Sequence, residues 1–238
     1  NRILNMQLTY GTDKISGKRY TAISKTLAIE KISELMELSE CRRVPTPIPE
    51  GSKPRRTVDT DKSANTSWKY ASILGGVLYI ANTTRPDICY SAHLLTRYLR
   101  NPNEAHHVLL KRLVRYLYHT RHVGLKFTSG GSNPYRLSSA SDSSFADCVD
   151  TNRSTLGFCT WLGDEPNGLI SWGSRIAKTV ALSTTEAEVQ ASIEALREVL
   201  WTRDFLGELG YIQSGSTRLW IDNNGAIGQI DACKNMKK

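Results

Sequence analysis

The hydrophobic pattern changes its period along the chain. From residue 68 to residue 128, apolar positions recur every three to four residues, which is typical of helices with one buried face. We expect a first helix over 73–81, a second after Pro86 and a third after Asn103. The inward positions are Ile73, Leu74, Val77, Leu78 and Ala81 in the first, Ile88, Ala92, Leu95 and Leu99 in the second, and Leu110, Leu113, Val114 and Leu117 in the third.

Beyond Asn133 the pattern shifts to short β-rich runs. These predict strands at 135–140, 157–162, 169–172 and 179–182. A helix follows, with one apolar stripe of Val189, Ile193, Leu196 and Leu200, and it stops near Gly210. A strand at 218–221 then runs into the first turns of another helix. Such an order predicts an α/β domain with a mixed sheet and flanking helices.

Two seams divide the chain. Residues 44–67 carry proline, serine and charge without an apolar period, which predicts a flexible connection, and 129–133 form a shorter joint. The 238 residues have room for two modest domains. We therefore predict a mainly helical region over 1–128 and an α/β domain over 129–238. The chain begins without methionine, so we expect it to be a piece of a longer protein.

Charge indicates the class of partner. The chain carries 31 lysines and arginines against 23 acidic residues, a net charge of +8, which favours a polyanion such as nucleic acid. On the third predicted helix, Lys111, Arg112 and Arg115 lie opposite the apolar face, and Arg121 follows just beyond. These four side chains are suited to contact a phosphate backbone, and an ordinary solvated helix face is the alternative.

The cysteines and the hydropathy of the chain argue against three further classes: disulfide-rich, zinc-binding and membrane-spanning proteins. The five cysteines are odd in number and form no C-x-x-C pair, so neither a disulfide framework nor a zinc site is indicated. A reducing compartment fits this pattern. The most apolar run, 73–81, is too short to span a bilayer, so no membrane partner is expected.

Two glutamates lie close together at the start of the helix that follows residue 182. Ser183 and Glu186 have the spacing of a capping box, in which each side chain bonds a backbone N–H of the other residue. Glu186 therefore has a local role. Glu188 adjoins the apolar stripe, and a carboxylate at the edge of a core needs a cation, an N–H group or a metal ion as partner.

Two aspartates strengthen the metal interpretation. Asp142 ends the run RLSSASD and Asp222 ends RLWID, so parallel strands would bring both to one sheet edge. Each also has an ordinary alternative, because Asp142 can open a turn and Asp222 can cap the next helix. Three carboxylates together would favour Mg²⁺ or Mn²⁺, and such ions support phosphodiester cleavage.

The same residues carry a family resemblance. The runs are SDSSFADCVDTNRSTLGF, LISWGSRIAKTVALSTTEAEVQAS, EVLWTRDFLGELG and LWIDNNGAI. They resemble the ribonuclease H domain of Ty1/copia-type LTR retrotransposon Pol polyproteins. Upstream, the run from SWKYASILGG to TRHVGL resembles the thumb and connection region that follows the polymerase palm.

The resemblance implies a ribonuclease H-like fold and Mg²⁺-dependent (or Mn²⁺-dependent) cleavage of the RNA strand of RNA/DNA hybrids during reverse transcription. Its metal-binding, catalytic acids fall on Asp142, Glu188 and Asp222. Implied partners are RNA/DNA hybrid, template-primer nucleic acid and the remainder of the Pol polyprotein. The implied location is the cytoplasm, within virus-like particles, with the nucleus as the alternative.

This chain departs from the family pattern at several places. The family reads D-A-D-W-A-G where residues 142–147 read DSSFAD, and a glutamine is replaced by Ala177, which we expect to alter substrate contact. The polymerase motif Y-x-D-D is absent. The family's last aspartate lies in a K-H-I-D segment beyond Asn235, so we expect the ribonuclease H-like domain to be truncated at Lys238.

Two functions therefore remain open. One is a hybrid-cleaving ribonuclease H, and the other is a catalytically inactive nucleic-acid-binding remnant of a truncated retroelement polyprotein. The integrase class orders its acids Asp, Asp, Glu. Here the glutamate precedes the last aspartate, which argues against an integrase.

Overall fold

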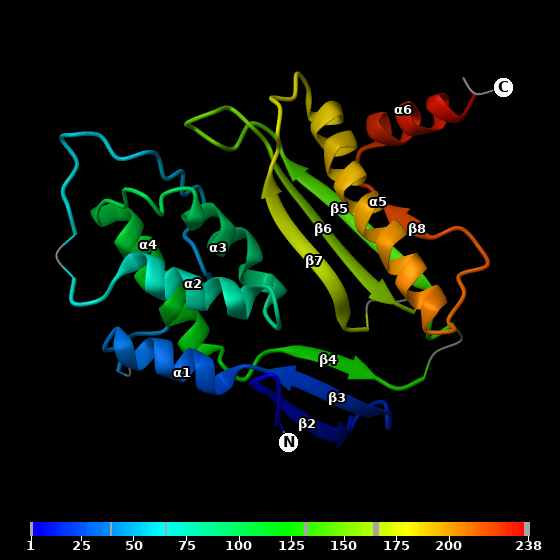
Figure 1. The fold of residues 1–238 in the computed structure, drawn as a ribbon, viewed down its shortest axis with the longest axis horizontal. Coiled ribbons are helices and arrows are strands. Elements are labelled where there is room, and N and C mark those ends of the chain that lie inside the picture. Colours follow the sequence, from blue (N-terminus) through cyan, green and yellow to red (C-terminus); the bar gives the residue numbers. More distant parts are fainter. Residues whose placement is uncertain (1, 39, 65, 131–132, 164–166, 236–238) are drawn as a thin grey trace. The chain divides into compact units, whose positions relative to one another are not determined.

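The computed structural model describes residues 2–38, 40–64, 66–130, 133–163 and 167–235, with side chains as far as 232. The chain forms two compact units, Asn1–Phe127 and Thr128–Lys238, and the boundary lies one residue before the predicted one. We call them unit 1 and unit 2. Figure 1 labels their elements. Within the described residues, no helix is both long enough and apolar enough to cross a membrane.

The helices of unit 1 surround a single apolar core. The three predicted helices are confirmed as α2, α3 and α4, and a fourth, α1, precedes them. A short 3-10 turn, η1, opens at Pro86, whose fixed φ suits the start of a helix. Their bounds are α1 Thr26–Leu35, α2 Tyr70–Ala81, η1 Pro86–Ile88, α3 Cys89–Thr96 and α4 Glu104–His119.

A capping box fixes the start of α4. The side chain of Asn103 accepts from the N–H of His106 at 3.2 Å, and His106 Nδ1 accepts from the N–H of Asn103 at 3.0 Å. The imidazole thus takes the place of the usual Glu or Gln. Tyr98 stacks on the His106 ring with centroids 4.1 Å apart, which joins α4 to the residue just after α3.

Unit 1 also contains a sheet that the hydrophobic pattern does not predict. Four strands pair in the order β1-β2-β3-β4. None of the residues in β1, β2 or β3 is fully buried, so these strands lack the alternation of apolar and polar residues that marks a half-buried strand. Their bounds are β1 Arg2–Ile3, β2 Met6–Thr12, β3 Arg19–Ser24 and β4 Leu125–Thr128.

Residues 44–67 contain no helix or strand in their described part, but several bonds fasten them to the helices. The Tyr98 hydroxyl donates to the carbonyl of Pro54 at 2.6 Å. Asp61 pairs with Arg55 at 2.8 Å and accepts from the Asn103 side chain at 3.0 Å. The segment therefore lies against the part of unit 1 that includes α4.

Unit 2 is an α/β domain with a mixed sheet, as predicted. The sheet order is β7-β6-β5-β8, in which β5 pairs antiparallel with β6 and parallel with β8. The long helix α5 lies across the face formed by β5 and β6 (Figure 1). The bounds are β5 Leu137–Ser144, β6 Thr155–Leu162, β7 Leu169–Ile176, α5 Thr184–Glu208, β8 Arg218–Trp220 and α6 Asn224–Asn235.

The predicted strand at 179–182 is wrong. Strand β7 instead extends to Ile176 and pairs with β6 along that length. Residues 179–182 form the loop that leads into α5, and the side chain of Leu182 is 90% exposed. The β-branched residues there have no neighbouring strand to pair with, so tertiary context overrides their strand propensity.

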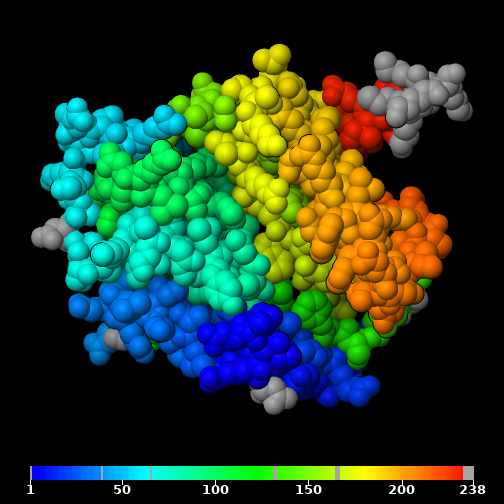
Figure 2. Space-filling model, viewed as in Figure 1, coloured from blue at the N-terminus to red at the C-terminus, as the bar shows by residue number. Residues whose placement is uncertain are grey.

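The predicted apolar stripe of α5 faces outward instead of inward. Ile193, Leu196 and Leu200 are exposed. Figure 2 shows α5 as yellow to orange spheres with one side of the helix open to view. The buried face is one of small residues together with two larger apolar ones. Small side chains let a helix approach a sheet closely, so they occupy the contact. The buried apolar residues are Ala187, Ala191, Ala195, Val199 and Leu206.

Candidate metal centre

Two of the predicted acids meet because β5 and β8 run parallel. Ala140 of β5 is paired with Trp220 of β8. Asp142 and Asp222 each lie two residues further along the chain, so they reach the same edge of the sheet. This is the arrangement expected at the carboxyl ends of parallel strands, where α/β proteins place ligands.

The third acid comes from α5. Glu188 lies in the second turn of the helix and is only 6% exposed. One oxygen from each of Asp142, Glu188 and Asp222 lies within 4.8 Å of the other two. All three site residues predicted from the sequence are therefore brought together by three different elements.

Glu188 is held by a neighbour of Asp142. The Ser143 hydroxyl donates to Glu188 Oε1 at 2.6 Å, and the Ser143 backbone N–H donates to the same oxygen at 3.1 Å. The other oxygen, Oε2, is buried and has no hydrogen-bond partner among the described residues. Burial raises the pKa of Glu188 above its ordinary value, and the charges of Asp142 and Asp222 add to this, against the Ser143 bonds.

These features fit a hard divalent cation. A buried carboxylate oxygen without a partner is costly, and three carboxylates this close repel one another unless a cation lies between them. Oxygen ligands of this kind are those that Mg²⁺ and Mn²⁺ prefer. Asp142, Glu188 and Asp222 could together hold such an ion.

Glu186 has the local role predicted for it, with one difference. Ser183 caps α5 by accepting from the Glu186 N–H at 3.1 Å. The Glu186 carboxylate accepts from the N–H of Leu182 at 2.8 Å, whereas a capping box would use the N–H of Ser183. The reciprocal bond therefore forms one residue earlier than predicted, because the loop before the helix turns the Leu182 N–H toward Glu186.

Two departures from the family pattern have structural roles in this chain. Both carboxylate oxygens of Asp147 accept from the Thr155 hydroxyl at 2.7 Å, which joins the turn after β5 to the start of β6. Ala177 is only 1% exposed and belongs to a small cluster with Leu156 and Ala191. Ala177 therefore has a packing role, and its effect on substrate contact stays a prediction.

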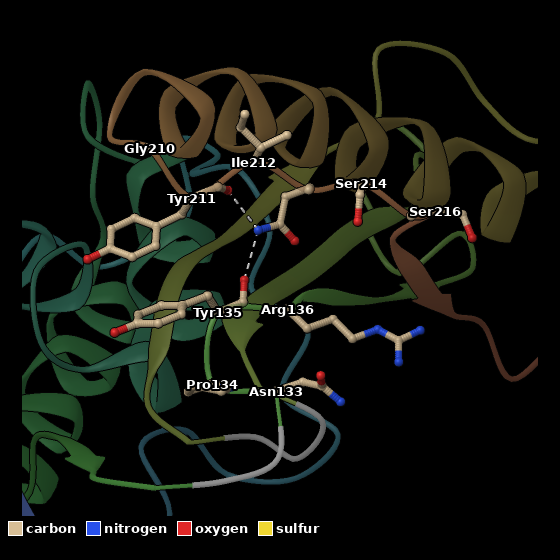
Figure 3. Close-up of a pocket in the computed structure, with 11 residues that line it drawn as sticks. Asn133, Pro134, Tyr135, Arg136, Gly210, Tyr211, Ile212, Ser214 and Ser216 are labelled. Carbon is tan, nitrogen blue, oxygen red and sulfur yellow. Dashed lines mark hydrogen bonds between the residues drawn. The ribbon is translucent and has the colours of Figure 1, made fainter.

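A second cleft in unit 2, of about 620 Å³, lies at the other ends of β5 and α5 (Figure 3). It is lined by residues 133–136 and 210–216, and the rings of Tyr135 and Tyr211 stack there with centroids 4.3 Å apart. The Gln213 side chain fixes the wall by accepting from the Leu137 N–H and donating to the Tyr135 carbonyl. None of the described residues that line it is acidic, histidine or cysteine, unlike the cluster of Asp142, Glu188 and Asp222.

The predicted phosphate-binding residues lie on α4 and just after it, in unit 1. Arg115 donates to the carbonyl of Arg42 at 2.6 Å, and Arg112 donates to the Thr46 hydroxyl at 2.9 Å. Lys111 is exposed. Arg121 forms an ion pair with Glu30 at 3.1 Å, so its charge is partly neutralised within the protein.

Two further arginines lie beside α4, on the segment that Arg112 and Arg115 contact. The sequence pattern did not indicate them as phosphate-binding residues. Arg42 and Arg43 are exposed, and the Arg115 and Arg112 bonds hold their segment against the helix. Within the described part of the chain, no acidic side chain pairs with any member of this group. We call it the basic face, and it comprises Arg42, Arg43, Lys111, Arg112 and Arg115.

The net charge is distributed very unevenly between the units. Unit 1 carries 21 lysines and arginines against 10 acidic residues, whereas unit 2 carries 10 against 13. The positive charge that favours a polyanion therefore belongs to unit 1, and the three clustered acids belong to the unit of opposite sign.

The cysteines form no disulfide among the four whose side chains are described, and the side chain of Cys233 lies outside that range. Cys89 and Cys148 are buried. Burial raises the pKa of the half-buried Cys159 thiol, which keeps it protonated.

Comparison with known proteins places the chain among transposon polyproteins. It is 34% identical to the retrovirus-related Pol polyprotein from transposon TNT 1-94 of Nicotiana tabacum over 218 residues, which is 90% of this chain and 16% of that protein. It is 34% identical to the retrovirus-related Pol polyprotein from transposon RE2 of Arabidopsis thaliana over 76% of the chain and 12% of that protein.

A shorter relative is also similar. The secreted RxLR effector protein 161 of Plasmopara viticola is 38% identical over 132 residues, which is 56% of this chain and 89% of that protein. No protein-family model matches the chain, and no solved structure matches it either.

The polyproteins match along most of this chain but extend far beyond it, since the chain spans 16% of the tobacco protein and 12% of the RE2 protein. The chain belongs to the family of retrovirus-related Pol polyproteins of Ty1/copia-type transposons.

Proposed function

We propose that unit 2 is a ribonuclease H-like domain that cleaves the RNA strand of RNA/DNA hybrids, and that unit 1 is the thumb and connection region of the same Pol polyprotein. The observation that carries the proposal is the convergence of Asp142, Glu188 and Asp222, where one buried oxygen of Glu188 has no hydrogen-bond partner in the described part of the chain. Membership of the Pol family supports the choice of a nucleic-acid substrate.

The two exposed acids and the buried acid have different roles in this proposal. Asp142 and Asp222 are exposed, so their carboxylates bind the cation from the side open to substrate. Glu188 is buried and binds it from within the domain. Mg²⁺ in such a site supplies Lewis-acid activation of water and of the scissile phosphate. The protein's own contribution is to fix the ligand positions before substrate arrives.

Cleavage is tested with a hybrid whose RNA strand carries the label. The purified chain is incubated with Mg²⁺, with Mn²⁺ and with a chelator. We expect the labelled RNA strand to be cut only with a divalent ion, and double-stranded DNA to remain intact. Cleavage of both substrates alike would contradict a hybrid-specific nuclease.

The second candidate function, an inactive nucleic-acid-binding remnant, gives a different result in the same experiment. The remnant would bind hybrid through the basic face and release no RNA fragment with any divalent ion.

Binding to hybrid should weaken steeply as salt rises, because neutralising phosphates releases condensed counterions. We expect the double variant Arg43→Gln/Lys111→Gln to bind roughly tenfold more weakly near 150 mM salt and to lower the slope of log K against log salt by about two. Fluorescence anisotropy over a salt series measures both quantities.

A matched control removes the same charge elsewhere in unit 1. Lys14 and Lys18 are exposed and lie between β2 and β3, outside the basic face. The double variant Lys14→Gln/Lys18→Gln should change the slope by clearly less. Equal slopes for the two double variants would mean that net charge alone, and no particular surface, attracts the hybrid.

A further inference from the structure

Ser143 is the residue that connects two of the clustered acids. It follows Asp142 directly on β5, and both its hydroxyl and its backbone N–H donate to Glu188 Oε1, at 2.6 Å and 3.1 Å. A short bond from a hydroxyl to a charged oxygen is among the stronger hydrogen bonds in proteins. The carboxylate of Glu188 is thus fastened to the strand that carries Asp142.

Both hydrogen bonds from Ser143 reach the same carboxylate oxygen of Glu188. Oε1 receives both donors, whereas Oε2 has no partner among the described residues and is fully buried. A glutamate side chain that has to be ordered on ligand binding loses rotamer freedom, which weakens binding. Here the ordering has already occurred, so a cation bound at Oε2 would not have to supply it.

The packing of α5 on β5 makes this contact possible. Alternate residues of a strand point to the same face, and on β5 these are Leu137, Ser139, Ser141 and Ser143. Leu137 packs with Val199 of α5, which shows that this face lies under the helix. Opposite the serines, α5 presents alanine and serine side chains, so helix and strand approach closely enough for Glu188 to reach Ser143.

We propose that Ser143 is a positioning residue for the metal centre: its hydroxyl holds Oε1 of Glu188 and thereby directs Oε2 toward the divalent cation shared with Asp142 and Asp222. This inference rests on the proposed function of the three acids.

The test is Mn²⁺ binding to the full chain. The affinity is measured by isothermal titration calorimetry and, independently, from the electron paramagnetic resonance signal of free Mn²⁺. Ser143→Ala keeps the backbone N–H bond and removes the hydroxyl, so we expect Mn²⁺ affinity to fall by about tenfold or more, the usual effect of losing a group that orients a metal ligand. Ser143→Thr retains a hydroxyl and should bind within a few-fold of the unsubstituted chain.

A matched control is the next residue. Ser144 is exposed, lies on the opposite face of β5 and has no hydrogen bond to Glu188, so Ser144→Ala should leave Mn²⁺ affinity unchanged. Where cleavage is measurable, a higher Mn²⁺ concentration should restore the rate of Ser143→Ala, because only the occupancy of the site is impaired.

The outcomes separate the two proposals. If the unsubstituted chain binds Mn²⁺ and Ser143→Ala binds it equally well, the positioning role is wrong while the metal centre stands. The same conclusion follows if Ser143→Thr is as weak as Ser143→Ala. If the unsubstituted chain binds no Mn²⁺, the metal centre is wrong and the role of Ser143 falls with it.

Discussion

Replacing Glu188 with glutamine is expected to lower metal-dependent hybrid cleavage at least about a thousandfold, since a lost ligand to a catalytic cation removes several kcal/mol of transition-state stabilisation. The amide keeps the shape of the side chain and can still accept the Ser143 bonds. The change therefore removes the charge of the one buried ligand and leaves its packing in place. A single-turnover assay on the labelled hybrid measures the loss.

The matched control is Glu186→Gln, two residues away on the same helix. Its carboxylate accepts from the N–H of Leu182, so the change weakens only the start of α5, by about 1 kcal/mol at most. Cleavage should stay within a few-fold of the unsubstituted chain. Equal losses from both substitutions, with the fold intact, would show that the assignment of Glu188 as the metal ligand is wrong.

Removal of Arg85 should have the largest effect on the stability of unit 1. Its side chain is 1% exposed and donates to both oxygens of Asp87, at 2.8 Å and 2.7 Å. It also donates to the carbonyl and to the hydroxyl of Thr120, which caps the C-terminus of α4. We expect Arg85→Ala to lower the free energy of unfolding by about 3–5 kcal/mol, because Asp87 and the helix end lose their partner.

The cost of Arg85→Ala should depend on pH. Burial by itself would raise the pKa of Asp87, but the Arg85 bonds and charge, with the Tyr116 hydroxyl, outweigh it, so the pKa lies below its ordinary value of 3.8. A carboxyl group with a lowered pKa in the folded state adds stability above its unfolded pKa and loses it as pH falls through the folded one. The difference between the two proteins should therefore shrink in acid.

Urea unfolding of the full chain at pH 7 and in acid measures both effects. Arg100→Ala removes an exposed arginine and should change the free energy of unfolding by no more than about 0.5 kcal/mol. Arg85→Lys should be closer to the alanine variant than to the unsubstituted chain, because an ammonium group cannot form the two-pronged bond to Asp87. A difference between Arg85→Ala and the unsubstituted chain that stays constant with pH would contradict the role given to Asp87.

The sequence predicted the candidate site better than it predicted the surfaces around it. Asp142 and Asp222 could be placed because a run of strand residues ends near each, and Glu188 because it adjoins buried positions. The contact with Ser143 could not be predicted, since it depends on how closely α5 approaches β5, and that distance is set by small residues without an apolar period.

The errors have the same physical origin. On α5 the larger apolar residues Ile193, Leu196 and Leu200 point outward, because the inner face is filled by alanines that helical periodicity weighs lightly. The strands of unit 1 were missed because their pairing over an exposed surface leaves no alternating pattern. Hydrophobic periodicity identifies the helices and strands that bury large side chains. It does not identify strands that are held together mainly by backbone hydrogen bonds.

The pairing of β3 with β4 has a consequence for how the chain folds as it leaves the ribosome. Roughly 100 residues separate the two strands, so closing that loop costs about 4 kcal/mol of chain entropy, which the helices between them must offset by collapsing first. Strand β3 can therefore pair with β4 only after the end of unit 1 has been synthesised, whereas β1, β2 and β3 are neighbours in sequence and can pair with one another earlier. In unit 2, β5, β6 and β7 pair with their neighbours in sequence and can do so early, whereas β8 can join β5 only after α5 has been synthesised.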